Sequence, residues 1–196
     1  MSDKLMAALE TVKTMPKITV GHVVNSMGED AITIVCLISI LPFLQPIPIP
    51  GLSTVLGLVA LMQGLGLLVS GKPILTNKLR EIEISPERFE LIYKTATKIT
   101  AFTSKISTLR HPLINTRPTQ IVGGISIILS AAFLALPLPI PFSNSIPAFS
   151  IFFICVALLE DDLAMMILGL GITATAMWMA YFSIHLISDQ FYNYFS

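Results

Sequence analysis

The chain carries IPGLSTVLGLVAL at residues 49–61 and IPAFSIFFICVAL at residues 146–158, and the two segments align without a gap. Six of the thirteen aligned positions are identical: an Ile, a Pro, a Ser, a Val, an Ala and a Leu. Each segment follows a proline-rich break in a hydrophobic stretch, and paired breaks in the two halves of a chain are typical of transporter-type membrane proteins. We interpret the match as an internal duplication, with the alternative that apolar composition alone produces it.

Apolar residues dominate the composition. They make up 54% of the chain, charged residues make up 12%, and the mean hydropathy is +0.79. These values exclude an ordinary soluble domain and predict an integral membrane protein. The N-terminal residues lack an uninterrupted apolar core followed by a small-residue cleavage site, so we expect no removable signal peptide. Cys36 and Cys155 each stand in an apolar run, where a thiol is expected to act as a small buried hydrophobe.

The hydrophobic stretches beside the breaks are short. Ala31 to Leu44 reaches roughly 21 Å as a helix, against a hydrocarbon core of roughly 30 Å. Ile121 to Leu136 and Ala148 to Leu159 reach only about 18–24 Å each, whereas Gly51 to Ser70, with about twenty residues, leaves a full crossing open. Proline removes amide donors and breaks helices. We therefore predict two re-entrant hairpins, broken by Pro42, Pro46, Pro48 and Pro50 in the first and by Pro137, Pro139, Pro141 and Pro147 in the second.

The last hydrophobic stretch, Leu163 to Ile187, has about twenty-five residues without proline or charge and is predicted to be the one complete span. The predicted fold is an all-α integral membrane protein with an internal duplication, two Pro-rich re-entrant (broken-helix) hairpins, one full transmembrane helix and a cytoplasmic amphipathic helix. Whether the two repeats run parallel or inverted stays open. The expected order is amphipathic interfacial helices (1–30), a first broken-helix repeat (31–71), a basic linker (72–120), a second broken-helix repeat (121–162), and the transmembrane helix with its tail (163–196).

The linker is basic and contains a well-marked helix. Nine Lys or Arg residues stand against four Glu residues between Lys72 and Arg117, so the positive-inside rule places residues 72–117 in the cytoplasm. Ser85 is a fair N-cap, and Pro86 fits the first helical position. We expect this amphipathic helix to pack on the membrane domain or on a second copy, with binding to anionic lipid as the alternative. Its apolar stripe is Phe89, Ile92, Ala96, Ile99, Phe102, Ile106 and Leu109, and the lysines off that stripe are Lys94, Lys98 and Lys105.

Polar side chains at the breaks and at the ends of the exit segments form the candidate site. When the alignment is extended, Gln63 is set against Glu160, and an ionisable group inside a membrane segment is a functional candidate by default. If the hairpin tips meet near the midplane, their polar groups, orphan carbonyls and helix N-termini would converge on an anionic headgroup or an ion. The candidate ligands are Gln45, Ser53, Thr54, Gln63, Asn144, Ser145, Ser150, Glu160 and Asp162, and the candidate pivots are Pro48, Pro50, Gly51, Pro139, Pro141 and Pro147.

Each part of this site has a purely structural alternative. Glu160, Asp161 and Asp162 can form an interfacial turn whose carboxylates cap the last helix. The small hydroxyls can satisfy the broken backbone and allow close helix packing. The sequence shows no paired nucleophile and base, no metal-binding motif and no cofactor fingerprint, and its three histidines are scattered. We therefore expect no enzymatic activity, no metal and no cofactor.

Several short motifs match a known family, from about Gly28 onward: Leu41-Pro42, Pro48 to Thr54, Leu61-Met62-Gln63, Leu138 to Pro141, Ile146-Pro147-Ala148 and Leu158 to Asp162. These segments resemble the ExoD family of bacterial membrane proteins of exopolysaccharide synthesis. The chain departs from the family pattern at Asp161, where an arginine is common, at Leu163, where a glycine is common, and near Ile74, where a tryptophan is common. The resemblance implies a role in exopolysaccharide or envelope production and carries no established reaction. By fold-level analogy, the broken hairpins also resemble DedA-type proteins that move polyprenyl-phosphate carriers.

Together these observations predict a multi-pass protein of the bacterial inner membrane that passes a lipid-linked or anionic solute, with Gln63 and Glu160 as a polar gate. The alternative is a non-transporting scaffold or regulator that docks an exopolysaccharide synthase through the amphipathic helix. One full span and four short arms leave broken backbone to be shielded from lipid, so we expect a homo-oligomer, with a two-fold dimer as the simplest form. Membrane lipid is an expected partner, and nucleic acid is not.

Overall fold

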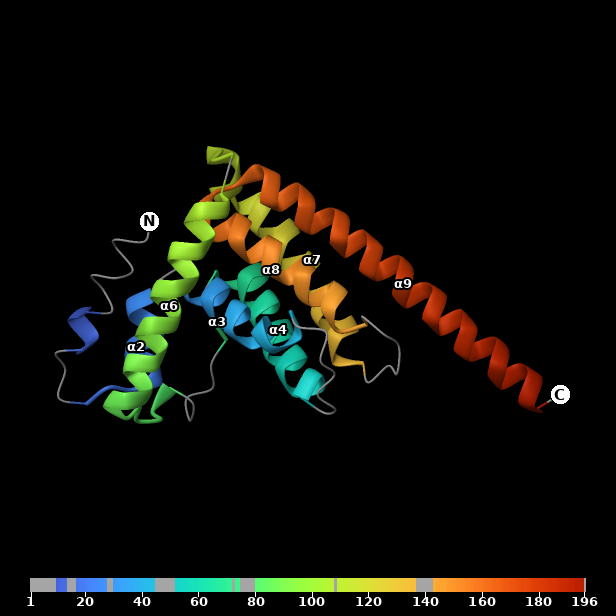
Figure 1. The fold of residues 1–196 in the computed structure, drawn as a ribbon, viewed down its shortest axis with the longest axis horizontal. Coiled ribbons are helices and arrows are strands. Elements are labelled where there is room, and N and C mark those ends of the chain that lie inside the picture. Colours follow the sequence, from blue (N-terminus) through green and yellow to red (C-terminus); the bar gives the residue numbers. More distant parts are fainter. Residues whose placement is uncertain are drawn as a thin grey trace.

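The computed structural model describes residues 10–13, 17–27, 30–44, 52–71, 73–74, 80–107, 109–136 and 143–195. Within these residues the chain is helical, and extended segments pair only at two isolated bridges, Thr19 with Glu83 and Arg110 with Asp162. The elements, shown in Figure 1, are α2 (Val20–Met27), α3 (Ala31–Ile40), η2 (Leu41–Phe43), α4 (Leu52–Val69), α6 (Pro86–Ile106), η3 (Pro112–Asn115), α7 (Arg117–Ala135), α8 (Ser145–Glu160) and α9 (Leu163–Phe195).

Helices α4 and α7 are antiparallel neighbours. At one end, the Arg117 guanidinium donates a hydrogen bond to the carbonyl oxygen of Leu67 at 2.9 Å. At the other end, Thr54 Oγ1 donates to the carbonyl oxygen of Ala135 at 3.1 Å. Thr54 thereby satisfies one of the carbonyls that a helix C-terminus leaves without an intrahelical partner. The start of α4 and the end of α7, each next to a proline-rich break, therefore lie side by side.

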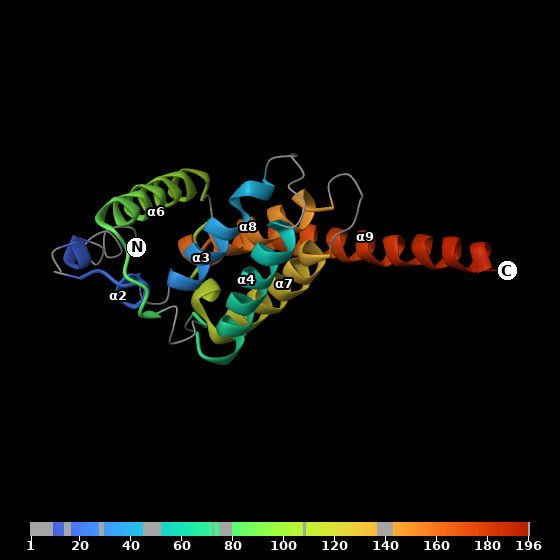
Figure 2. The same cartoon turned by 90° about the horizontal axis from the view of Figure 1, so that it is seen from below.

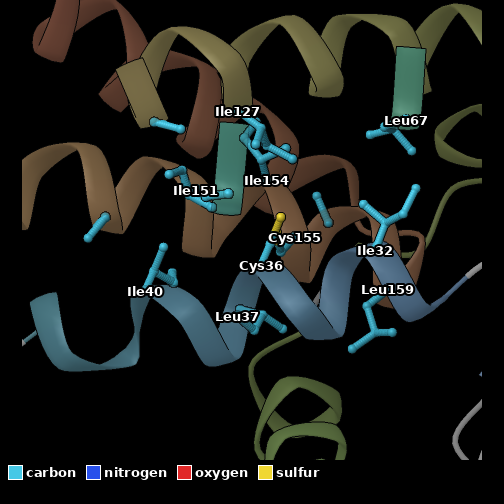
Figure 3. Packing of buried hydrophobic residues seen from close by; sticks show 14 of the residues in the cluster. Ile32, Cys36, Leu37, Ile40, Leu67, Ile127, Ile151, Ile154, Cys155 and Leu159 are labelled. Carbon is cyan, nitrogen blue, oxygen red and sulfur yellow. The ribbon is translucent and has the colours of Figure 1, made fainter. Parts of the chain in front are cut away.

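Helix α8 runs antiparallel to α9 and to α3. Ser150 bonds to Thr173 at 2.6 Å, and four residues further along α8 the side chain of Ile154 lies against Gly169. Figure 3 shows α3 passing α8, with Cys36 beside Cys155 in the middle of the apolar core. Both cysteines are buried free thiols, as predicted from their apolar surroundings.

The two hairpins, α3 with α4 and α7 with α8, turn at the same end of the bundle. We call this the hairpin end, and we call the opposite end, where α7 and α9 begin, the linker end. The hairpins therefore point the same way, which answers the question of parallel or inverted halves for these helices. The breaks themselves, residues 45–51 and 137–142, lie outside the described residues, so the re-entrant form of the hairpins and their origin by duplication stay predictions.

Two helices, rather than the one predicted, are long and apolar enough to cross a membrane: Arg117–Ala135 and Leu163–Ser183. The predicted arm from Ile121 was too short because α7 begins four residues earlier, with Pro118 in its first turn, where a missing amide is tolerated. A third span results if Val20–Met27 and Ala31–Phe43, bent by 116°, are counted as one broken helix. The C-terminal part of α9 projects beyond the other helices (Figures 1 and 2).

Close helix packing depends on glycines. A Cβ added to Gly64 in α4 would lie 2.8 Å from Ile128 and 3.2 Å from the carbonyl oxygen of Gly124 in α7. A Cβ added to Gly169 in α9 would lie 2.8 Å from the side chain of Ile154 in α8 and 3.0 Å from its backbone nitrogen. Small residues that let backbones approach are the usual means by which helices associate in lipid, where the hydrophobic effect supplies no attraction between them.

We expect Gly169→Ala to destabilise the α8–α9 contact by about 1–3 kcal/mol, because the added methyl group overpacks against Ile154. Gly171 is a matched control two residues along the same helix, since a Cβ there would meet nothing within 4 Å. Gly171→Ala should leave the thermal midpoint in detergent unchanged or raise it slightly, because alanine favours the helix. Equal midpoints for the two variants would contradict the packing argument.

The N-terminal segment packs on the linker. The amide of Val20 donates to the carbonyl of Ile82, and the amide of Ile84 donates to the carbonyl of Ile18. Lys17 forms an ion pair of 2.9 Å with Glu83, whose carboxylate raises the pKa of Lys17 through a hydrogen bond and through its charge. The buried cluster beneath these contacts joins α2, the start of α3 and Phe89 of α6. Residues 17–27 and the linker therefore lie on the same side of the bundle.

Candidate functional site

The acidic turn, Glu160-Asp161-Asp162, joins α8 to α9 at the linker end. Asp161 ends α8 in the left-handed conformation, with φ of 57°, which Asp adopts more readily than most residues. The Glu160 side chain is only 8% exposed. Its carboxylate accepts hydrogen bonds from Thr103 Oγ1 at 2.8 Å and from the Arg110 guanidinium at 3.0 Å. Burial of the Glu160 carboxylate is unfavourable by itself, and the hydroxyl and the guanidinium from the linker offset that cost with hydrogen bonds.

Asp162 is fully buried, and donors from the linker and from α9 surround its carboxylate. The donors are Ser107 Oγ at 2.9 Å, the amide of Leu109 at 2.9 Å and the amide of Met165 at 3.0 Å. The bond to Met165 caps the first turn of α9, which is the structural alternative that the sequence left open for this turn. The other two bonds reach the linker, so Asp162 joins α9 to the segment that follows α6.

Backbone hydrogen bonds complete this contact. The amide of His111 donates to the carbonyl of Asp161 at 2.7 Å, and the amide of Leu163 donates to the carbonyl of Leu109 at 3.0 Å. These two bonds flank the isolated bridge between Arg110 and Asp162. We call Ser107, Leu109, Arg110 and His111, together with Thr103, the linker clamp. The clamp helps to explain why adjacent acids are tolerated beside apolar helices, because the linker donates hydrogen bonds to both oxygens of Glu160, to Oδ2 of Asp162 and to the carbonyl oxygen of Asp161.

Asp161 is the least well satisfied of the three acids. Its Oδ1 is buried, and no hydrogen-bond partner for it exists among the described residues. Burial raises the pKa of the Asp161 carboxyl, and the nearby charge of Arg110 opposes that shift only in part. Asp161 therefore destabilises the folded chain at neutral pH, because the charged form is the one that burial disfavours.

Gln63 lies in the middle of α4 and is 2% exposed. Its Oε1 has no hydrogen-bond partner among the described residues. Glu160, its counterpart in the predicted polar gate, bonds instead to Thr103 and Arg110 of the linker, so the gate stays a prediction. The side-chain oxygen of Gln63 nevertheless lies inside an apolar bundle, where a polar group without a hydrogen bond lowers the stability of the folded chain by about 1–3 kcal/mol.

The remaining described candidates lie at or near the hairpin end. Ser53 is 5% exposed, and Thr54 bonds to the end of α7. Asn144 precedes α8 without a side-chain cap, Ser145 is its first residue, and Pro147 lies in its first turn, where proline is tolerated. Gln45, Pro48, Pro50, Gly51, Pro139 and Pro141 lie outside the described residues.

Ser150 is the centre of a buried hydroxyl cluster that joins three helices. It bonds to Ser130 of α7 at 2.9 Å and to Thr173 of α9 at 2.6 Å, and all three side chains are at most 6% exposed. Thr173 Oγ1 also donates to the carbonyl of Gly169 at 2.9 Å. The sequence reasoning missed Ser130 and Thr173, although each is a small polar residue within an otherwise apolar helix, which is the signal that could have identified them.

Comparison with known proteins gives a consistent result. A family model described as "Exopolysaccharide synthesis, ExoD" matches residues 1–182. The chain is 27% identical over 167 residues to Protein ExoD of Rhizobium meliloti (strain 1021), covering 83% of this chain and 68% of that protein. It is 28% identical over 149 residues to an uncharacterized protein of Synechocystis sp., covering 75% of this chain and 69% of that protein. No solved structure matches it.

Proposed function

The chain belongs to the ExoD family of exopolysaccharide-synthesis proteins, and from this premise we propose that it passes a lipid-linked or anionic solute across the bacterial inner membrane. The observation that carries the proposal is the buried Gln63 amide, whose Oε1 has no partner among the described residues. Polar groups within membrane helices are costly and usually line a cavity or a path. A residue that serves only packing would favour an apolar side chain at this position.

The arrangement of the hairpins supports the same proposal. The hydrogen bond between Thr54 and Ala135 holds together the start of α4 and the end of α7, which flank the two breaks, and we expect the polar groups at the tips to converge there. Ser150 and its two partners add a buried group of three hydroxyls between α7, α8 and α9. Glu160 is the polar group of the proposed path at the linker end, where Arg110 and Thr103 bond to its carboxylate. A two-fold homo-oligomer that covers the broken backbone is part of the proposal.

Gln63→Leu should lower transport at least about tenfold, because it removes a polar contact that the passing solute would make. The measurement is flux through reconstituted vesicles, with a fluorescently labelled polyprenyl phosphate in one arm and inorganic phosphate in the other. The same variant should keep or raise the thermal midpoint, since it removes an unsatisfied buried oxygen.

Met62→Leu is the matched control, because Met62 is the preceding residue of α4 and is 40% exposed on the outer face. It should change neither flux nor stability. If Gln63→Leu leaves both fluxes intact, Gln63 is not part of a pathway. If the variant unfolds instead, the Gln63 amide has a structural partner, and its burial no longer supports a transport path.

A scaffold that docks exopolysaccharide-synthesis proteins is the second candidate. It is favoured by the exposed positions of Lys94, Lys98 and Lys105 along one face of α6. A docking surface needs accessible charges of this kind. The occupant of that face can be tested separately from transport.

A further inference from the structure

The outward face of α6 combines lysines with exposed apolar side chains. Leu91 is 66% exposed and Phe102 is 53% exposed, although both are large hydrophobic residues. At about 100° of rotation per residue, these two and the three lysines fall within about 80° of one another. The opposite face turns inward, where Phe89 and Thr103 are buried. We call Leu91, Lys94, Lys98, Phe102 and Lys105 the outward face.

This face is positively charged. The sequence holds no Asp or Glu between Glu90 and Glu160, so no acidic residue follows the fifth residue of the helix. Lys94 lies 3.7 Å from Glu90, an exposed contact worth only a few tenths of a kcal/mol. Within the part of the chain that the structure describes, no ion pair involves Lys98 or Lys105. The acids near this face are Glu90 and the exposed Glu87, which lies a turn before Leu91 on the same side of the helix.

The face also borders the surface that the bundle presents to lipid. The ring of Phe102 lies 6.3 Å from that of Phe152 in α8. Phe152 precedes Glu160 by eight residues, or about 12 Å along the helix toward its apolar middle. Phe102 therefore points from the linker end along the membrane helices. The aromatic contacts continue on α8, with Phe153 5.3 Å from Phe152 and 6.5 Å from Phe149.

The orientation of α6 fits the same location. Figure 1 shows α6 lying across the end of the bundle where α9 begins, at a steep angle to α9, and Figure 2 shows α6 at that same end. If α7 and α9 cross the membrane, α6 therefore runs along its surface. Helices in this position bury apolar side chains at the boundary between headgroups and acyl chains, while lysines extend their ammonium groups to the phosphates.

We propose that the outward face of α6 binds the anionic lipid surface of the leaflet next to the linker. Lys94, Lys98 and Lys105 contact lipid phosphates, and Leu91 and Phe102 enter the boundary region. Each lysine near an anionic surface shifts the equilibrium by about fivefold, so three together favour the docked state by about a hundredfold. This inference concerns a surface at the linker end and does not depend on whether the chain transports a solute.

The test places a nitroxide label on Cys introduced at Phe102 in the full-length chain, reconstituted in nanodiscs. One set contains only phosphatidylcholine, and the other contains about one third phosphatidylglycerol. With anionic lipid, the label should become more accessible to oxygen and less accessible to a water-soluble nickel chelate. The triple variant Lys94→Gln, Lys98→Gln, Lys105→Gln should lose that shift, and so should the parent protein at 1 M salt, where the Debye length is about 3 Å.

Ser104→Cys is the matched control, because Ser104 is exposed on the other side of the same helix. Its label should remain accessible to the chelate in both kinds of nanodisc. Equal accessibility at Phe102→Cys with and without phosphatidylglycerol would overturn the proposal. Protection that is the same in detergent, in neutral lipid and in anionic lipid would also overturn it, since a protein surface such as a second copy would then cover the face.

Discussion

Asp162→Ala should lower the stability of the folded chain by about 3–5 kcal/mol. Asp162 is fully buried and accepts hydrogen bonds from Ser107, from the amide of Leu109 and from the amide of Met165. Loss of the N-cap on α9 costs about 0.5–2 kcal/mol, and each buried donor left without an acceptor costs about 1–3 kcal/mol. The change should appear as a fall of roughly 10 °C in the thermal midpoint in detergent.

The same variant should release the linker clamp before the bundle melts. Ser107 and Leu109 lose their acceptor together, so residues 107–111 should become sensitive to protease at temperatures where α7 and α9 remain folded. Asp162→Asn should fall between the parent and Asp162→Ala, because one acceptor oxygen remains. A midpoint for Asp162→Ala within 1 °C of the parent would show that these three bonds do not hold the turn.

Asp161→Asn is the matched control on the neighbouring residue. Burial raises the pKa of Asp161 in the folded chain, so the folded state holds this proton at a higher pH than the unfolded state does. The Asp161 carboxyl therefore stabilises the folded chain at a pH below its pKa in the unfolded state, and this contribution is lost as the pH rises through its pKa in the folded state. Asn also tolerates the left-handed conformation. The variant should therefore match or exceed the parent's midpoint at pH 7, with the difference shrinking as the pH falls below about 4.

Much of the fold follows from local sequence patterns. Proline-rich breaks and apolar stretches predicted two hairpins and a long last helix, because helix ends depend on residues close in sequence. Pro86 and Ser85 located the start of α6 correctly. The length of α7 was underestimated, since Arg117, Pro118, Thr119 and Gln120 are polar or helix-breaking by propensity. They become helical because Arg117 bonds to α4 and because proline is tolerated in a first turn.

The partners of the acidic turn could not be predicted in the same way. Thr103, Ser107 and Arg110 lie 50 or more residues before Glu160 in sequence, and only the packing of α6 on α8 brings them together. The amphipathic pattern also assigned Phe102 and Leu109 to the apolar stripe, and the single chain leaves them 53% and 52% exposed. The periodicity of apolar residues predicts that a helix has an apolar face, but it does not predict which residues at the edge of that face are buried. Their burial depends on how the neighbouring helix packs against the face.

Arg117→Ala should destabilise the contact between the two hairpins by about 2–4 kcal/mol. The Arg117 guanidinium donates to the carbonyl of Leu67 at 2.9 Å, to the carbonyl of Leu68, and to the carbonyl of Val69 at 3.4 Å. These carbonyls belong to the last turn of α4 and would otherwise lack intrahelical donors. Hydrogen bonds from a charged donor contribute about 1.5–3 kcal/mol each, reduced here because the contact is partly exposed. The measurement is the thermal midpoint in detergent, together with hydrogen exchange at the end of α4.

Arg117→Lys separates charge from geometry. A lysine keeps the favourable interaction with the negative end of the α4 dipole, worth about 0.3–1 kcal/mol, but it cannot reach several carbonyls with a planar fork. It should therefore recover less than half of the loss seen with alanine. Lys98→Ala, which removes an exposed cation from α6, controls for net charge and should leave the midpoint within about 0.5 kcal/mol of the parent. If Arg117→Lys restored the full thermal midpoint, the positive charge alone would explain the contact between the hairpins. The planar guanidinium and its several hydrogen bonds would then not be needed to hold the end of α4 against α7.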